Sequence, residues 1–186
     1  RNPNVDITAC DVSKRRLEEM QRLFQHAPSM THVKYVTADA ANIELQPELD
    51  LILCDAPCSG TGTLARNPEI RHRLMEKELK RQRERQVRIL LSLMNGVKIG
   101  GQLLYSTCSL EPEENEDVIR ECLQGSNEFE LVPMEKEIER LNQAGVLRAQ
   151  AADRLNQTAL VNGCLRTIPG IHDCDGFFAA LLVKRT

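Results

Sequence analysis

Two cysteines that stand fifty residues apart could carry out covalent chemistry in this chain. Cys58 lies in the segment Asp-Ala-Pro-Cys-Ser-Gly, and Cys108 lies in Ser-Thr-Cys-Ser. Each follows a short apolar run, Leu49–Cys54 or Gly101–Tyr105, that predicts a strand. Because open α/β sheets bind their ligands at the carboxyl ends of the strands, we expect both thiols at one binding edge. Two thiols at such an edge indicate attack on an electrophilic carbon.

A cytosine ring is one carbon electrophile that such a pair could activate. A thiol with a pKa of about 8.5 is ionised to a few per cent near neutral pH, and the thiolate is the attacking form. Addition of the thiolate at C6 turns C5 into an enamine carbon, which can accept a methyl group. A carboxyl group near N3 would favour this addition by holding or donating a proton. Asp55, three residues before Cys58, is placed for that role.

Acidic residues recur at the ends of the predicted strands in the first third of the chain. Asp11, Asp39 and Asp55 follow, in order, the apolar or β-branched runs Val5–Ala9, Val33–Thr37 and Leu49–Cys54. An acid at the position of Asp11 can accept hydrogen bonds from ribose hydroxyls, and Asp39 could accept one from the amino group of an adenine. Each acid taken alone also fits a surface turn.

Helices alternate with these strands. The predicted helices are Lys14–Phe24, which follows the helix cap Ser13, then Glu76–Asn95, and a third that runs from Ser109 to Leu123. We predict a helical or loop insertion at residues 133–160. A closing pair of strands is predicted at Cys164–Ile168 and Phe177–Val183. The alternation predicts an α/β fold with a doubly wound, mostly parallel sheet, to which the closing pair adds an antiparallel C-terminal edge strand.

Composition sets the class of protein. A chain of 186 residues with 41% hydrophobic content can bury one core, so we expect 1–186 to form a single domain. Seven cysteines, an odd number with several in apolar stretches, are typical of reduced thiols and predict a cytoplasmic protein. We expect Cys10, Cys54 and Cys122 to be buried as small hydrophobic residues.

Two kinds of partner are not expected. No run of the sequence approaches the roughly 20 apolar residues that a membrane helix needs, which argues against a membrane partner. The sequence has no C-x-x-C pair, and Cys54, which stands four residues before Cys58, is expected to be buried, so we predict no metal site.

The net charge of −3 hides a basic segment. Between Arg66 and Arg88 nine Lys or Arg residues stand against four Glu residues. Such a bias is typical of a surface that binds a polyanion, although a solvated helix face could carry the same charges. Arg66, Arg71 and Arg73 follow the Cys58 loop directly, so we expect them to contact that polyanion near the loop.

Three motifs carry a family resemblance: Asp55-Ala-Pro-Cys-Ser-Gly-Thr-Gly, Tyr105-Ser-Thr-Cys-Ser-Leu-Glu-Pro-Glu-Glu-Asn and Asp175-Gly-Phe-Phe. They resemble the signatures of the S-adenosylmethionine-dependent RNA cytosine-5 methyltransferases of the Nop/Sun family. Ile168-Pro-Gly ahead of Asp175 is similar to the ending of the bacterial 16S rRNA enzymes of the RsmB (Sun) type. The resemblance implies a class I, Rossmann-like methyltransferase fold, S-adenosylmethionine as the cofactor, and an RNA substrate, with rRNA first and tRNA as the alternative.

The resemblance also implies roles for individual residues. Cys108 would be the nucleophile that attacks C6, and Cys58 would help to release the methylated base. The cofactor would be held by Asp11 at its ribose and by Asp39 at its adenine, with Asp55 and Pro57 where the methyl donor meets the target base. With RNA as the polyanion, we expect Arg66, Arg71 and Arg73 to contact its backbone near that base.

Other interpretations stay open. DNA cytosine-5 methyltransferases use the cysteine of a Pro-Cys motif on the loop after this strand, which would make Cys58 the nucleophile. The Gly-rich first motif of the RNA family, which binds the methionine part of the cofactor, has no counterpart ahead of Val5, and neither has its strand. We therefore expect the chain to be the C-terminal part of a catalytic domain. A non-catalytic RNA-binding or assembly fragment is the alternative to an enzyme.

Overall fold

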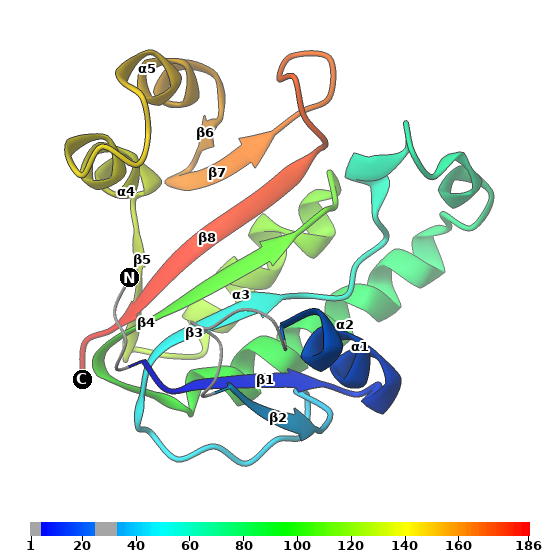
Figure 1. The fold of residues 1–186 in the computed structure, drawn as a ribbon. Helices are drawn as coiled ribbons and strands as arrows, with labels where there is room; N and C mark the ends of the chain where they lie inside the picture. The colour runs from blue at the N-terminus through cyan, green and yellow to red at the C-terminus, as the bar shows by residue number, and fades with distance from the viewer. Residues whose placement is uncertain (1–4, 25–32) are drawn as a thin grey trace.

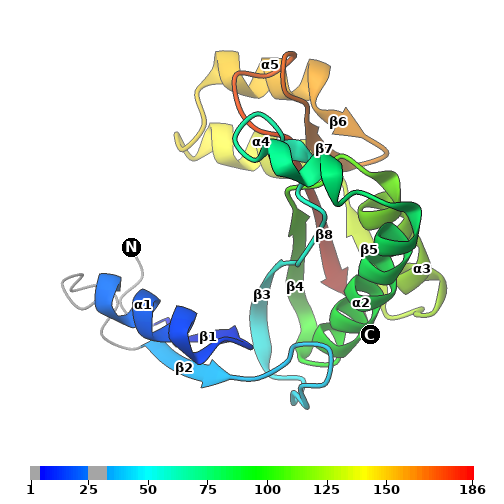
Figure 2. The same cartoon turned by 90° about the vertical axis from the view of Figure 1, so that its right-hand side faces the viewer.

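The computed structural model describes residues 5–24 and 33–186, and in these residues the strands form two sheets. The smaller sheet pairs β1 (Ile7–Asp11) with β2 (Val33–Thr37) in parallel, and α1 (Lys14–Phe24) packs on both strands. Figure 2 shows this unit standing apart from the larger sheet. The predicted helix and second strand are confirmed, whereas β1 begins two residues later than predicted and includes Asp11.

The larger sheet has a mixed arrangement (Figure 1). Its strands run in the order β3 (Leu49–Asp55), β4 (Val97–Thr107), β8 (Phe177–Lys184), β7 (Cys164–Thr167) and β6 (Leu160–Val161), and β5 (Phe129–Val132) also pairs with β8. β3 and β4 are parallel, and the pairs of β8 with β4, β5 and β7 are antiparallel. The parallel pair β3 and β4 therefore carries both cysteine loops at its carboxyl end.

The position of β8 corrects one prediction. The α/β class is confirmed and the last strand is antiparallel, but β8 is not an edge strand, because β4 lies on one side of it and β5 and β7 on the other. All residues from Phe178 to Val183 are buried. A continuous apolar run of this kind is typical of a strand that is covered on both faces rather than of an edge.

Two helices cover one face of the larger sheet. Figure 2 shows α2 (Glu76–Met94) and α3 (Glu116–Gln124) side by side on this face. α2 matches its prediction to within one residue and buries the apolar stripe of its C-terminal half. The core that results contains, among others, Leu90 of α2, Val118 and Cys122 of α3, Leu103 and Tyr105 of β4, and Phe178 of β8. Sequence spacing therefore placed the largest helix correctly, and this helix supports the strands that carry the site.

The segment between β5 and β7 is helical. It contains α4 (Met134–Gln143) and α5 (Ala149–Thr158), which contact each other, and the short strand β6 follows. The helical interpretation of the insertion is thus confirmed, while β5 and β6 were not predicted. β4 also begins at Val97, before the predicted start at Gly101, and Gly100 adopts a positive φ of 77° where the register with β3 shifts.

Short 3-10 helices follow each cysteine loop: η2 (Thr61–Thr63) and η3 (Pro68–His72) after Cys58, and η4 (Pro112–Glu114) after Cys108. In the part of the chain that the structure describes, no helix is long and apolar enough to cross a membrane.

Candidate active site

The two cysteines meet at the carboxyl ends of β3 and β4. Asp55, the last residue of β3, stands opposite Ser106 of β4 in the parallel register, so the loops that follow both strands start side by side. The Sγ atoms of Cys58 and Cys108 are 3.3 Å apart, and both residues are half-buried. The predicted meeting of the two thiols at one sheet edge is what the structure shows.

The two thiols differ in acidity. A hydrogen bond from Cys58 to the Cys108 sulfur lowers the pKa of Cys108 to about 7, against the opposing effect of burial. The same hydrogen bond, together with burial, raises the pKa of Cys58. A thiol that donates to a neighbouring sulfur stabilises the thiolate there and keeps its own proton. Near neutral pH Cys58 therefore keeps its proton, while about half of the half-buried Cys108 is ionised.

A buried carboxylate ties the Cys58 loop to the Cys108 loop. Glu114 has no solvent exposure, and its two oxygens accept hydrogen bonds from the Ser59 backbone N–H at 2.9 and 3.1 Å. The Ser59 hydroxyl donates to it at 2.5 Å, and the Gln86 side-chain amide donates at 3.1 Å. The sequence predicts a helix from Ser109 to Leu123 and indicates no role of its own for Glu114 within it, so this contact was missed.

The next two residues anchor two further segments. The Asn115 side chain accepts from the Thr107 hydroxyl at 2.6 Å and donates to the Ser109 carbonyl at 2.9 Å, which fixes the chain on both sides of Cys108. Glu116 forms an ion pair with Arg166 of β7 at 2.5 Å, with both side chains largely buried. Three consecutive residues thus hold the Cys58 loop, the Cys108 loop and β7 in fixed relative positions.

Glycines let three backbone segments approach closely beside the thiols. The Gly62 N–H donates to the Cys108 carbonyl at 2.9 Å, and the Gly176 N–H donates to the Gly62 carbonyl at 2.9 Å. A Cβ atom at Gly62 would lie 2.3 Å from the Gly176 oxygen and 2.7 Å from the Cys108 oxygen. The loop after Cys58 therefore needs glycine at this position to reach the loop after Cys108.

Asp55 and Pro57, the other two residues predicted beside the thiols, each form a hydrogen bond within the site. Asp55 is exposed, and its carboxylate lies 3.5 Å from the Ser106 hydroxyl. The Pro57 carbonyl accepts from Gln86 at 2.8 Å. Their roles toward a base or a cofactor stay predictions, and the exposed carboxylate of Asp55 leaves acceptor positions free for them.

Asp11 and Asp39 lie at the carboxyl ends of the smaller sheet and cap the turns that follow. Asp11 accepts from the Ser13 N–H at 2.7 Å and from Arg16 at 3.3 Å. Asp39 accepts from the Ala41 N–H at 3.1 Å and from Asn42 at 3.0 Å. A carboxylate has about four lone-pair positions, so each acid can accept further bonds from a ligand hydroxyl or amine. Both residues therefore fit an adenosine group, although their role toward one stays a prediction.

The basic residues after the Cys58 loop are exposed, but one of them already has a partner. Arg66 forms an ion pair with Asp175, the acid of the Asp-Gly-Phe-Phe motif. Arg71 is exposed and donates to the Pro68 carbonyl at 3.1 Å, and Arg73 is exposed as well. Arg71 and Arg73 are thus better placed than Arg66 to contact a phosphate.

The other cysteines do not join the site. Burial raises the pKa of Cys54, Cys122 and Cys164 to about 12, so they remain neutral thiols. The expectation of burial is confirmed for Cys54 and Cys122 and is wrong for Cys10, which is exposed at the end of β1. Within the described ranges, no group of three or more His, Cys, Asp or Glu side chains is arranged to hold a metal ion.

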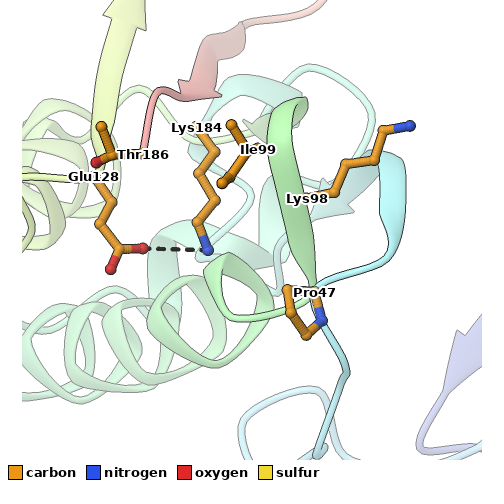
Figure 3. Close-up of a pocket in the computed structure, with 6 residues that line it drawn as sticks. All are labelled: Pro47, Lys98, Ile99, Glu128, Lys184 and Thr186. Carbon is orange, nitrogen blue, oxygen red and sulfur yellow. Dashed lines mark ion pairs between the residues drawn. The ribbon is translucent and has the colours of Figure 1, made fainter.

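A cavity of about 500 Å³ lies at the other end of the larger sheet. Figure 3 shows its lining residues, Pro47, Lys98, Ile99, Glu128, Lys184 and Thr186, with Glu128 and Lys184 paired at 3.2 Å. Lys98 and Ile99 stand near the start of β4, whereas Cys108 follows its end. This cavity is therefore separate from the candidate active site.

Comparison with known proteins shows which protein family the chain resembles. Residues 1–183 match the family model described as 16S rRNA methyltransferase RsmB/F. The ribosomal RNA small subunit methyltransferase B of Xanthomonas campestris is 33% identical over 99% of this chain and 38% of its own length. The mouse 28S rRNA (cytosine-C(5))-methyltransferase is 38% identical over 73% of this chain and 17% of its own.

A solved structure agrees with these relatives. NSun6 from Pyrococcus horikoshii, solved with SFG, superposes with a TM-score of 0.71 at 25% identity and covers 99% of this chain and 42% of that one. The chain thus spans about two fifths or less of the length of these relatives.

Proposed function

The chain belongs to the RsmB/F family of 16S rRNA methyltransferases, and from that premise we propose that it methylates C5 of a cytosine in RNA, with 16S rRNA as the substrate and tRNA as the alternative. The observation that carries the proposal is the pair of thiols 3.3 Å apart in which Cys108 is the more acidic. A nucleophilic cysteine needs to be ionised near neutral pH, and this pair supplies one. We also propose that the protein works in the cytoplasm, where its RNA substrate would be found.

In the proposed reaction the Cys108 thiolate forms a bond to C6 of the base. The electron pair of the C5–C6 double bond moves toward C5 and the ring nitrogen N3, where Asp55 holds or donates a proton. C5 then takes the methyl group. In the release step C5 loses its proton to a base, N3 returns any proton that it took from Asp55, and the C5–C6 double bond forms again as the bond from C6 to sulfur breaks. Cys108 leaves as a thiolate. The Cys58 thiol favours this release because it donates a hydrogen bond to the departing sulfur.

S-adenosylmethionine would supply the methyl group by cleavage of its sulfur–methyl bond and would leave as S-adenosylhomocysteine. SFG, present in the Pyrococcus horikoshii relative, is an analogue of this cofactor. In this chain Asp11 would hold the ribose and Asp39 the adenine, since each has acceptor positions beyond those that cap its turn. Asp55 and Pro57 would line the place where the methyl donor and the base meet.

The phosphate backbone of the RNA would follow the basic segment. Arg71 and Arg73 are exposed beside η3, and Arg66 would join them only if it exchanged Asp175 for a phosphate. Contacts to phosphate position the strand without reading its sequence, so the choice of cytosine depends on other contacts.

A trapping experiment tests the proposal in the protein as its gene encodes it. The protein is incubated with S-adenosylmethionine and an RNA that carries 5-fluorocytidine, whose fluorine prevents release, and the covalent complex is read on a denaturing gel. We expect the complex with the unmodified protein and with Cys58→Ala, and none with Cys108→Ala. A complex with Cys108→Ala but not with Cys58→Ala would make Cys58 the nucleophile.

Calorimetry separates an enzyme from a non-catalytic RNA-binding fragment. Titration of the same protein with S-adenosylmethionine should give heat of binding that Asp11→Ala weakens. No detectable binding, together with retained RNA affinity, would favour the non-catalytic alternative.

A further inference from the structure

Glu114 combines full burial with an unusual set of partners. Its carboxylate receives hydrogen bonds from the backbone and hydroxyl of Ser59 and from the amide of Gln86, which is itself fully buried. All of these partners are neutral donors, and among the described residues no Lys or Arg pairs with it. Burial of a charge is costly unless hydrogen bonds satisfy it, so this arrangement demands that the donors stay in place.

The partners of Glu114 lie where they can set the position of Cys58. Ser59 is the residue after Cys58, and Gln86 also donates to the carbonyl of Pro57, the residue before it. The backbone of Glu114 is fixed in turn, because the Tyr105 hydroxyl donates to its carbonyl at 2.7 Å from inside β4. The Cys58 loop is therefore held after the cysteine by Glu114 and before it by Gln86, which also bonds to Glu114, and Glu114 is anchored on the strand that leads to Cys108.

We propose that Glu114 is a positioning residue that sets the distance between the two thiols through Ser59. The effect of Glu114 on release of the methylated base rests on the proposed function. Without the Glu114 carboxylate, Ser59 would lose the hydrogen bonds that hold the residue next to Cys58, while Gly62 would still join the two loops farther along the chain. The contact of 3.3 Å between the sulfurs would then lengthen. Glu114 does not touch the base or the cofactor in this role and acts through Cys58.

The test compares Glu114→Gln with Glu113→Gln in the protein as its gene encodes it. Glutamine keeps the size of Glu114 but places an amide donor against the donors of Ser59 and Gln86. Glu113 is the exposed neighbour in η4, and its substitution makes the same change in charge. Thermal melts of both variants report whether the fold is kept.

Two measurements read the position of Cys58 rather than the stability of the fold. The first is the pH midpoint of iodoacetamide alkylation at Cys108, which needs neither RNA nor cofactor. We expect Glu114→Gln to shift this midpoint upward by about one pH unit. The Cys108 thiolate loses the hydrogen bond from Cys58, which is the largest influence on the Cys108 pKa and outweighs the smaller opposite effect of removing the Glu114 charge; Asp55, the other acid that raises this pKa, is unchanged. Glu113→Gln should keep the midpoint of the unmodified protein.

The second measurement is the fraction of protein that stays covalently bound to ordinary, unfluorinated RNA during turnover. Because a hydrogen bond to a charged group is worth enough to change a rate about tenfold or more, Glu114→Gln should release the base at least about tenfold more slowly. The covalent complex should then accumulate at a pH where Cys108 is ionised, and it should not accumulate with Glu113→Gln.

The outcomes are distinguishable. A folded Glu114→Gln variant with an unchanged alkylation midpoint overturns the proposal, and so does an equal shift with Glu113→Gln. If Glu114→Gln does not fold, Ser59→Ala, which removes only the hydroxyl donor, should give a smaller upward shift, and no shift would overturn the proposal. If the unmodified protein forms no complex with RNA, the proposed function fails while the midpoint still decides the role of Glu114.

Discussion

Removal of the Cys58 thiol should change the reactivity of Cys108 in a pH-dependent way that can be calculated. The hydrogen bond from Cys58 is the main cause of the lowered pKa of Cys108, about 7. In Cys58→Ala this donor is gone, and the pKa of Cys108 should rise at least to the ordinary value of about 8.5, because burial and the nearby acids Asp55 and Glu114 also raise it. At pH 7 the ionised fraction of Cys108 should then fall from about one half to about 3%, roughly 16-fold.

A thiolate of higher pKa is also a stronger nucleophile, which offsets part of this loss. With a Brønsted coefficient of about 0.45, a rise of about 1.5 units in pKa makes the thiolate roughly five times more reactive. Alkylation of Cys108 in Cys58→Ala should therefore be about threefold slower than in the unmodified protein at pH 7 and about fourfold faster at pH 9. The two rate profiles should cross between these values.

The assay is alkylation by iodoacetamide across this pH range, with the peptide that carries Cys108 quantified by mass spectrometry. Cys174, which is exposed, serves as an internal reference in each sample. Cys58→Ser, whose hydroxyl can still donate to the thiolate, is the matched control and should keep a profile close to that of the unmodified protein. Parallel profiles that never cross, or a Cys108 midpoint of about 8.5 already in the unmodified protein, would refute the reasoning.

Three further results are expected. Gly62→Ala should lower the free energy of unfolding, measured by denaturant titration, by about 3 kcal/mol or more, because its methyl group would lie 2.3 Å from a backbone oxygen. Gly125→Ala is the control and should change this free energy little, since the nearest atom to its methyl group would be 3.8 Å away. Hydrogen peroxide should join Cys58 and Cys108 in a disulfide, since their sulfurs are already 3.3 Å apart. Mass spectrometry should show the loss of two hydrogens, which dithiothreitol should reverse. Two separate sulfenic acids would contradict the geometry. Arg71→Glu should weaken RNA binding and flatten its dependence on salt in a filter-binding titration, and an unchanged affinity would remove this residue from the contact surface.

Local signals in the sequence were enough for several of the elements that position the thiols, although α3 begins at Glu116, after η4, and not at the predicted Ser109. The helix α1 and the strand β2 have the predicted bounds, and the amphipathic stripe of α2 placed that helix to within one residue. The strand-to-loop transitions before Cys58 and Cys108 also sufficed to place both sulfurs at one edge. These features depend on residues that are close together in the chain.

The missed features depend on partners that are distant in the chain. β5 has four residues and is a strand only because it pairs with β8, some fifty residues later. Glu114 lies in an acidic run that a helix N-terminus explains well, and nothing local indicates that its carboxylate bonds to Ser59, 55 residues earlier. The ion pair of Arg66 with Asp175 spans 109 residues. Such contacts are fixed by the tertiary fold, which sequence periodicity does not encode.

The central place of β8 has a consequence for how the protein folds. This strand is the last along the chain, yet it pairs with β4 through contacts such as Gln102 with Val183, which are about eighty residues apart. Contacts of this separation slow folding, because a long loop must close before they form. Gly176, which bonds to Gly62 beside the thiols, directly precedes β8. Docking of β8 therefore brings in the residue that closes the cysteine loops, so we expect the reactive pair to take its final geometry only after this long-range pairing has formed.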